Sequence, residues 1–301
     1  MNSYNKEAIF HLPGLFRLTK IYEILLDGYV NHPEMFKDNV KIGSIYGSPT
    51  CIWNGGRVMV NCAYPKEQLE LIRNFTEHYK IPARFTFTNC LLEEKHIYDT
   101  YGNLILRIFD TGHNEIICNK EVLENYIREK YGDRYKYISS TTKRLTSTEA
   151  QNSEIDKDYY LIVLDYDHNK DFDYLKSIKN KAKCELLCNP ICGAKCAFRS
   201  KHYEQISQAQ LEFSEDNSRP PCSYVQNDTL WTAMKQKNFI SPEDINDIYL
   251  PMGFSNFKLE GRTASPLDLI ETLVYYLIKE EYKNEVRTYL QMAVLAPQIN
   301  R

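Results

Sequence analysis

The sequence has no long hydrophobic run and no marked excess of either charge. Nowhere do about 20 apolar residues follow one another, which is the length that a membrane-spanning helix needs. The first 15 residues lack a basic segment followed by an apolar run of the kind that directs export. The net charge of −3 argues against a protein that coats nucleic acid, because such binding neutralises many phosphates. We therefore expect a cytoplasmic protein that makes no membrane contact.

Several catalytic sequence motifs are also absent. The chain has no serine nucleophile elbow and no phosphate-binding glycine loop. It has neither the cysteine pairs with two intervening residues that zinc prefers nor the cysteine spacing of radical S-adenosylmethionine enzymes. No repeat, low-complexity tract or linker divides the chain, which predicts a single domain over residues 1–301.

Short apolar runs alternate with segments of helical period, which is typical of parallel strands joined by crossover helices. The expected strands are 9–16, 41–46, 83–88, 115–118, 135–139, 159–164, 184–188 and 256–260. The clearest expected helices are 65–79, 120–131, 171–178 and 266–279. Eight strands predict a TIM-like (β/α)8 barrel, with an open doubly wound sheet as the alternative. A long polar excursion, at about 199–247, precedes the last strand.

Four of the nine cysteines fall within thirteen residues, at positions 184, 188, 192 and 196. Because a cytosolic chain seldom keeps disulfides, this gathering of thiols predicts a metal centre. Alternation along the expected strand puts Cys184 in the core. Cys192 and Cys196 follow in a loop, where a small buried hydrophobe has little reason to lie, so we expect both to be ligands. The loose spacing favours an iron-sulfur cluster over zinc.

Charged residues gather at the expected strand ends, where the site of a barrel lies. Arg199 and His202 stand three residues apart on an expected helix and can hold an anionic substrate or donate to cluster sulfurs. The alternative is a helix-surface pair. Lys258, Glu260 and Arg262 alternate along the last strand and so share one face. Because buried charges must be paired, they predict an ion network, a substrate clamp or both, with Arg262 as the better anion binder.

Three motifs stand in order at residues 189–202 (NPICGAKCAFRSKH), 239–244 (FISPED) and 253–262 (GFSNFKLEGR). In this order they resemble the U-32 peptidase (collagenase-like) family. The resemblance implies a cytosolic barrel protein that binds an oxygen-sensitive [4Fe-4S] cluster through four cysteines. It also implies oxygen-independent hydroxylation or a related modification of RNA or a small aromatic compound. A peptidase and a non-catalytic iron-sulfur subunit of a heteromeric complex are the alternatives.

The resemblance also implies a ligand set. The loop 45–53 (IYGSPTCIW) is similar to a strand-end loop that carries one ligand in the ubiquinone-linked branch of the family. The ligands implied are therefore Cys51, Cys192, Cys196 and Cys222, with Cys188 in reserve. A homologous partner subunit is a further implication. The chain lacks the longer glycine- and serine-rich cysteine motif of the hydroxylase and peptidase branches, so the resemblance names no substrate.

Overall fold

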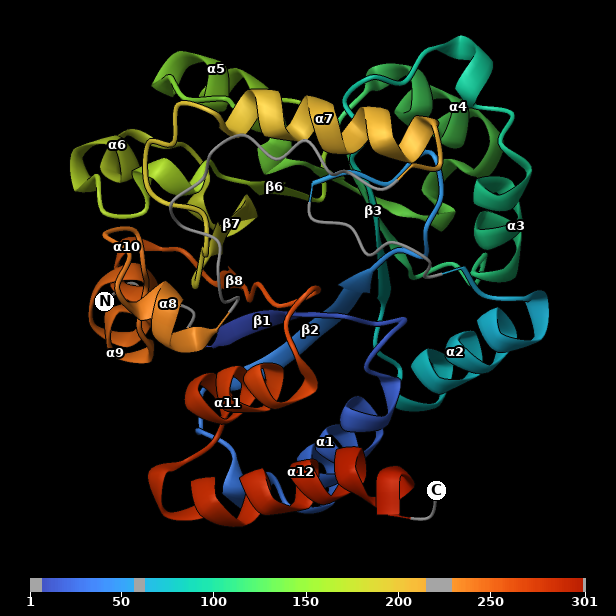
Figure 1. Cartoon of the computed structure of the whole chain (residues 1–301). Coiled ribbons are helices and arrows are strands. Elements are labelled where there is room, and N and C mark those ends of the chain that lie inside the picture. The colour runs from blue at the N-terminus through green and yellow to red at the C-terminus, as the bar shows by residue number, and fades with distance from the viewer. Residues whose placement is uncertain (1–6, 57–62, 215–228, 300–301) are drawn as a thin grey trace.

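Eight parallel strands form a closed barrel in the computed structural model of the chain, which describes residues 7–56, 63–214 and 229–299 (Figure 1). The strands are β1 (Ala8–Pro13), β2 (Val40–Gly47), β3 (Ala83–Phe87), β4 (Glu115–Cys118), β5 (Lys136–Ser139), β6 (Leu161–Val163), β7 (Cys184–Leu187) and β8 (Asn256–Lys258). Each strand pairs in parallel with the next along the chain, and β8 pairs with β1. The predicted TIM-like barrel is confirmed, and the open sheet is excluded.

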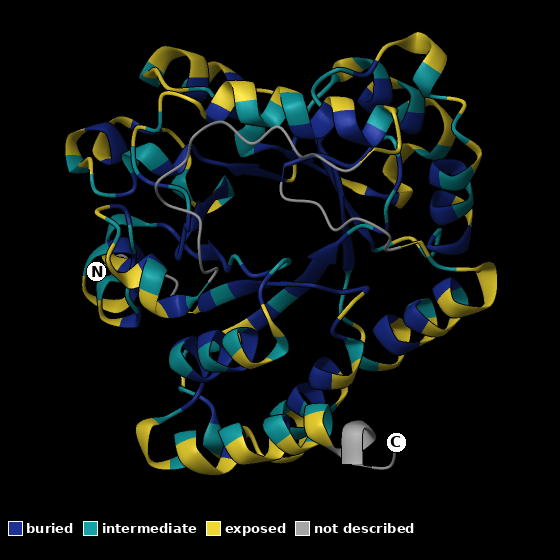
Figure 2. Ribbon diagram, viewed as in Figure 1, coloured by how far each residue is buried: buried dark blue, intermediate teal, exposed yellow. Residues whose placement is uncertain are grey.

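Helices surround the barrel, with buried residues mostly on their inner faces and exposed residues on their outer faces (Figure 2). They are α1 (Thr19–Asn31), α2 (Lys66–Tyr79), α3 (Thr100–Ile108), α4 (Glu121–Tyr131), α5 (Thr148–Ile155), α6 (Phe172–Ser177), α7 (Arg199–Leu211), α8 (Leu230–Met234), α9 (Pro242–Asp244), α10 (Leu250–Met252), α11 (Pro266–Leu277) and α12 (Lys283–Ile299). The four helices predicted from the sequence correspond to α2, α4, α6 and α11. None of the described helices is both long and apolar enough to cross a membrane.

Strand side chains alternate between the barrel interior and the surrounding helices. On β7, Cys184 and Leu186 belong to the apolar core outside the barrel, whereas Glu185 contacts interior side chains of β1 and β3. One half of the interior is apolar and forms a small separate cluster of Ile117, Ile138, Leu161 and Val163. The other half, contributed by β1, β2, β3, β7, β8 and the first residue of β4, is polar and lies below the predicted site.

The chain between β7 and β8 contains α7, α8, α9 and α10, so the predicted polar excursion holds three helices and the start of a π-helical turn (Ile245–Tyr249). In Figure 1, α7 lies in front of the strand ends along one edge of the barrel opening. This helix separates the carboxyl ends of the strands from solvent on that side and is part of the candidate site.

Candidate functional site

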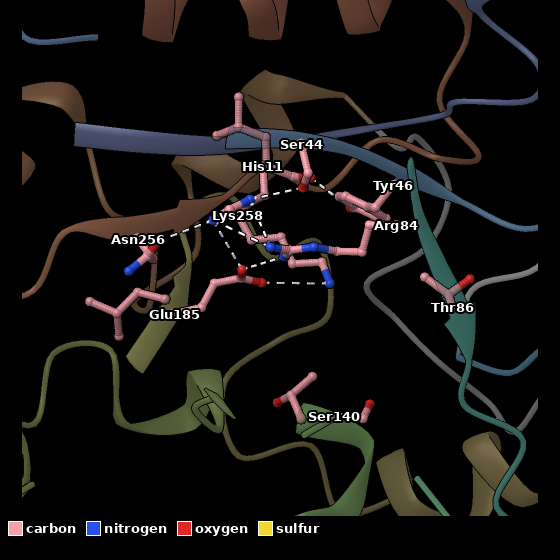
Figure 3. A network of polar contacts seen from close by, with 12 residues as sticks. His11, Ser44, Tyr46, Arg84, Thr86, Ser140, Glu185, Asn256 and Lys258 are labelled. Carbon is pink, nitrogen blue, oxygen red and sulfur yellow. Dashed lines mark hydrogen bonds and ion pairs between the residues drawn. The ribbon is translucent and has the colours of Figure 1, made fainter. Parts of the chain in front are cut away.

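A fully buried arginine organises the floor of the barrel. Arg84 of β3 donates from Nε to Glu115 Oε2 at 2.6 Å and from Nη2 to His11 Nδ1 at 2.8 Å, and its Nη1 pairs with Glu185 (Figure 3). All four side chains are at most 2% exposed. A buried charge is tolerated only when it is paired and hydrogen-bonded, and Arg84 meets both conditions.

The contacts of His11 define its protonation. Because a guanidinium can only donate, the Nδ1 atom that faces Arg84 is an acceptor, and the ring carries its proton on Nε2. Nε2 can then donate to Asn256 Oδ1 at 3.2 Å, while Ser44 Oγ lies 2.9 Å from Nδ1. Burial, reinforced by the charge of Arg84, lowers the pKa of His11 to about 3. The ring is therefore neutral at physiological pH.

Lys258 of β8 lies between this floor and the space above it. Its Nζ is 3.8 Å from Glu185 Oε1 and 4.3 Å from the centre of the Tyr46 ring. Burial lowers the pKa of Lys258 to about 7, with Arg84 and Arg262 acting in the same direction and Glu185 opposing them. The side chain keeps 11% of its surface exposed, and that surface faces a cavity.

The cavity has a volume of about 110 Å³ and lies at the carboxyl ends of the strands. Thr86 and Ser140, from β3 and the end of β5, stand on the opposite side from Lys258 (Figure 3). The wall nearest α7 is formed by Cys192, Cys196, Phe198, Arg199, His202, Tyr203 and Ile206. Strand ends and α7 together enclose the space, as expected for the site of a parallel barrel.

The amino-terminal end of α7 is held down by Arg199. Its Nη1 lies 2.8 Å from Asp167 Oδ2 and 3.5 Å from Asp165 Oδ1, and its Nη2 donates to the Gly193 carbonyl at 2.7 Å. Asp167 also accepts from the backbone N–H of Lys195 at 2.6 Å. These contacts fasten both α7 and the preceding cysteine loop to the loop after β6.

The other end of α7 is fastened to the loop after β3. Asn89 Nδ2 donates to the Ser207 carbonyl at 3.0 Å, and the Ser207 hydroxyl accepts from the backbone N–H of Cys90 at 3.1 Å. The helix thus bridges the loops after β3 and β6 along one side of the barrel opening (Figure 1). We call α7 the roof of the cavity, because it covers one side of it.

The cysteine loop is also tied to the end of β8. The Asn189 side chain donates to the Glu260 carbonyl at 2.9 Å and accepts from the Glu260 N–H at 2.7 Å. The Glu260 carboxylate in turn accepts from the backbone N–H of Ile191 at 3.0 Å. Gly261 follows with φ of +153°, a conformation that side chains other than glycine rarely adopt. These hydrogen bonds join the motif at residues 189–202 to the motif at residues 253–262.

The structure brings together two of the predicted cluster ligands. The thiols of Cys192 and Cys196 contact each other, and both line the cavity. Burial raises the pKa of the Cys196 thiol, and the neighbouring Cys192 raises it further. The predicted ligand Cys222 lies outside the described residues.

Cys51 and Cys188 do not reach the cavity wall, although both were expected to face the barrel mouth. Cys51 is 1% exposed in the apolar core, where burial raises its pKa to about 12. Cys188 is fully buried outside the barrel beside Tyr249 and Tyr276, and burial raises its pKa well above the ordinary value. We therefore place Cys188 in the core. Within the described residues, no three histidine, cysteine or acidic side chains are grouped so that they could hold a metal ion.

All five predicted charged residues, Arg199, His202, Lys258, Glu260 and Arg262, line the cavity. Two of them also have structural contacts, since Arg199 and Glu260 fasten the loop and roof. Arg262 donates to Thr86 Oγ1 and lies near the Tyr46 ring. The sequence analysis did not predict the buried contacts of Arg84 with Glu115, Glu185 and His11 in the barrel floor. A charged residue inside a buried apolar strand, as at Arg84 and Glu185, is the signal that would have identified it.

No protein-family model matches the chain. A curated protein of Methanocaldococcus jannaschii, named uncharacterized protease MJ1657, is 27% identical over 143 residues, which is 45% of this chain and 41% of that protein. The matched region thus spans less than half of that relative. The solved structure of the U32 peptidase Mk0906 covers 86% of this chain and 94% of its own, with a TM-score of 0.52 and 12% identity. At this identity the structural likeness shows the fold.

The chain is a TIM-like barrel protein whose cavity lies at the carboxyl ends of the strands under a helical roof. The sequence relationship and the shared barrel together support the predicted membership of the U32 peptidase family.

Proposed function

We propose that the chain is an iron-sulfur barrel protein that takes part in oxygen-independent hydroxylation, or a related modification, of a small compound. The observation that carries this proposal is the pair of thiols, Cys192 and Cys196, on the wall of a basic cavity. The cavity of about 110 Å³ is smaller than the roughly 150 Å³ cavity that admits benzene, so it favours a small substrate over an RNA base.

The donor chemistry of the described residues fits half of a [4Fe-4S] cluster, which takes four thiolates. Cys192 and Cys196 would hold it on the cavity side. Cys222 and Cys51 are proposed for the other two positions, and Cys51 would have to leave its buried position in the loop after β2. When bound, such a cluster would supply electron transfer.

The other residues of the cavity would bind and orient the substrate. Arg262 and Lys258 make one wall basic, which suits an anionic group. The α7 roof, fastened by Arg199, covers one side of the cavity, and the limited access of water there would strengthen these electrostatic contacts. The hydroxyls of Thr86 and Ser140 can hydrogen-bond neutral oxygen atoms of the same ligand.

Anaerobic purification followed by iron and sulfide analysis tests the cluster. We expect a brown protein with about four iron atoms per chain. Single changes of Cys51, Cys192, Cys196 and Cys222 to alanine should each lower the iron content. Cys184→Ala is the matched control, because that thiol is buried outside the barrel and should leave the iron content unchanged. A colourless or zinc-loaded wild type would contradict the proposal.

A peptidase is the second candidate function. Both similar proteins carry protease or peptidase names, and Ser44, His11 and Glu185 form a chain of contacts in the order of a serine-protease triad. Against it, Ser44 is fully buried, and Arg84 already occupies the histidine nitrogen that a nucleophile would use.

A cytoplasmic location remains a proposal, supported by the seven described cysteines, which are all free. A non-catalytic role beside a homologous partner subunit remains a further proposal.

A further inference from the structure

We propose that Lys258 forms a reversible imine with a small 2-oxo acid bound in the roofed cavity. The inference goes beyond the proposed function and needs no cluster. It starts from position: Lys258 extends from β8 into the cavity, and its ion pair with Glu185 Oε1, at 3.8 Å, is longer than a hydrogen bond. The amine is therefore open to a ligand in the cavity.

The surroundings of Lys258 suit an amine that alternates between neutral and cationic forms. Its burial favours the neutral amine, which is the nucleophile, and lowers its pKa to about 7. Glu185 Oε1 is buried and accepts no hydrogen bond within the described residues, and the Tyr46 ring lies 4.3 Å from Nζ. Both can stabilise the positive charge of an iminium without releasing any other partner.

The chemistry needs no further reagent. The neutral Nζ adds to the carbonyl carbon, and one amine proton moves to the carbonyl oxygen to give a carbinolamine. Loss of the hydroxyl group with the second amine proton, as water, leaves a carbon-nitrogen double bond, and hydrolysis reverses both steps. Ser140, which lies across the cavity from Lys258, can hydrogen-bond the departing oxygen (Figure 3).

Arg262 assigns the ligand class. Its guanidinium carbon is 5.8 Å from the centre of the same Tyr46 ring that Lys258 contacts, and its Nη1 and Nη2 donate to Thr86 Oγ1 and the Gly55 carbonyl, so Arg262 extends along the cavity border from the Lys258 side to Thr86. A guanidinium binds a carboxylate through two parallel hydrogen bonds. A small cavity with a nucleophilic amine beside an arginine therefore fits a carbonyl carbon next to a carboxylate.

Reductive trapping tests the inference on the full-length protein. The protein is incubated with pyruvate and cyanoborohydride at neutral pH, and the modified lysines are located by peptide mass mapping. Lys37 is the internal control, because burial lowers its pKa to about 8 but it donates to the Tyr275 carbonyl outside the cavity. We expect labelling of Lys258 to exceed that of Lys37 by at least about tenfold, since only Lys258 has a binding site beside it. Equal labelling of the two lysines would overturn the proposal.

Two variants separate imine formation from its ligand class and from the cluster. Arg262→Gln should lower labelling by pyruvate but not labelling by acetone, which has no carboxylate, and equal loss with both probes would overturn the 2-oxo acid assignment. Cys192→Ala should keep the label while losing iron. A wild-type protein that holds iron but shows no label on Lys258 would refute the imine and leave the proposed function standing. A wild-type protein that is labelled but holds no iron would support the imine and refute the iron-sulfur proposal. Lys258→Met, checked by its melting temperature, should lose the label.

Discussion

The barrel floor and the cavity above it contain the same kinds of charged side chain in opposite situations. In the floor, Arg84 contacts two carboxylates and a histidine, and every member of the group is sealed from solvent. In the cavity, Lys258 and Arg262 border open space and share the face of Tyr46. The comparison shows that charge alone does not mark a functional residue. A cation sealed from solvent among its partners serves the fold, whereas one that borders a cavity can in addition contact a ligand there.

The two regions meet at Glu185. One of its oxygens contacts Arg84 and His11, and the other faces Lys258 without a hydrogen bond. The Arg84 contacts therefore also fix the carboxylate that adjoins the cavity. Burial alone would raise the pKa of Glu185, but Arg84, His11 and Lys258 outweigh it and lower the pKa to about 2. The floor thus presents a permanent negative charge below the cavity.

The largest expected effect is that of removing the floor arginine. Arg84→Met leaves Glu115 and Glu185 buried without their main partner, and breaking a buried ion pair typically costs about 3–5 kcal/mol. Urea unfolding of the two proteins measures the difference. Arg134→Met is the matched control, because its pair with Asp110 is largely exposed and should contribute less than about 1 kcal/mol. Similar losses in both variants would remove the distinction between floor and surface.

A smaller effect for each unit of pH is expected from the acid titration of His11. Its pKa is about 3 in the folded protein and 6.5 ordinarily, so between these values the unfolded chain binds a proton that the folded chain does not. Stability should therefore fall as the pH falls below 6.5, by about 1.4 kcal/mol per pH unit. Urea unfolding at several pH values should show this contribution lost in His11→Gln and kept in His78→Gln, an exposed change on α2. An unchanged slope in His11→Gln would show that the floor tolerates a charged imidazole.

Much of the fold was predictable because the strands are short, apolar and buried on both faces. Helix α5 was not predicted, and the reason is chemical. Its inward side carries Gln151 and Glu154, so the apolar period of a helix is missing. Glu154 is tolerated there because it accepts from Ser139 Oγ and pairs with Lys143, both at 2.6 Å. Such partners come from other elements, and local sequence does not reveal them.

The same limit applies to the site. Glu260 was identified because Lys258, Glu260 and Arg262 alternate along the last expected strand, and all three line the cavity. Its contact with Asn189, in another motif, became visible only in the structure. Cys51 was expected at the mouth, but Trp53 is fully buried and its Nε1 donates to the His96 carbonyl at 2.7 Å. This contact draws the loop into the core. The floor network was missed because its partners are adjacent only once the barrel closes.

The smallest effect is expected from the residue that most resembles a nucleophile. Ser44→Ala removes one neutral hydroxyl beside His11, and losing such a hydrogen bond typically costs about 1 kcal/mol. Arg84 still donates to His11 Nδ1, so the floor keeps its ion pairs and the cavity keeps its shape. We therefore expect labelling of Lys258 and any activity on a small substrate to stay near the wild-type level. If the protein hydrolyses peptides and Ser44→Ala abolishes that hydrolysis, the floor is an active site. The distinction between a floor that only stabilises the fold and a cavity that binds the substrate would then be wrong.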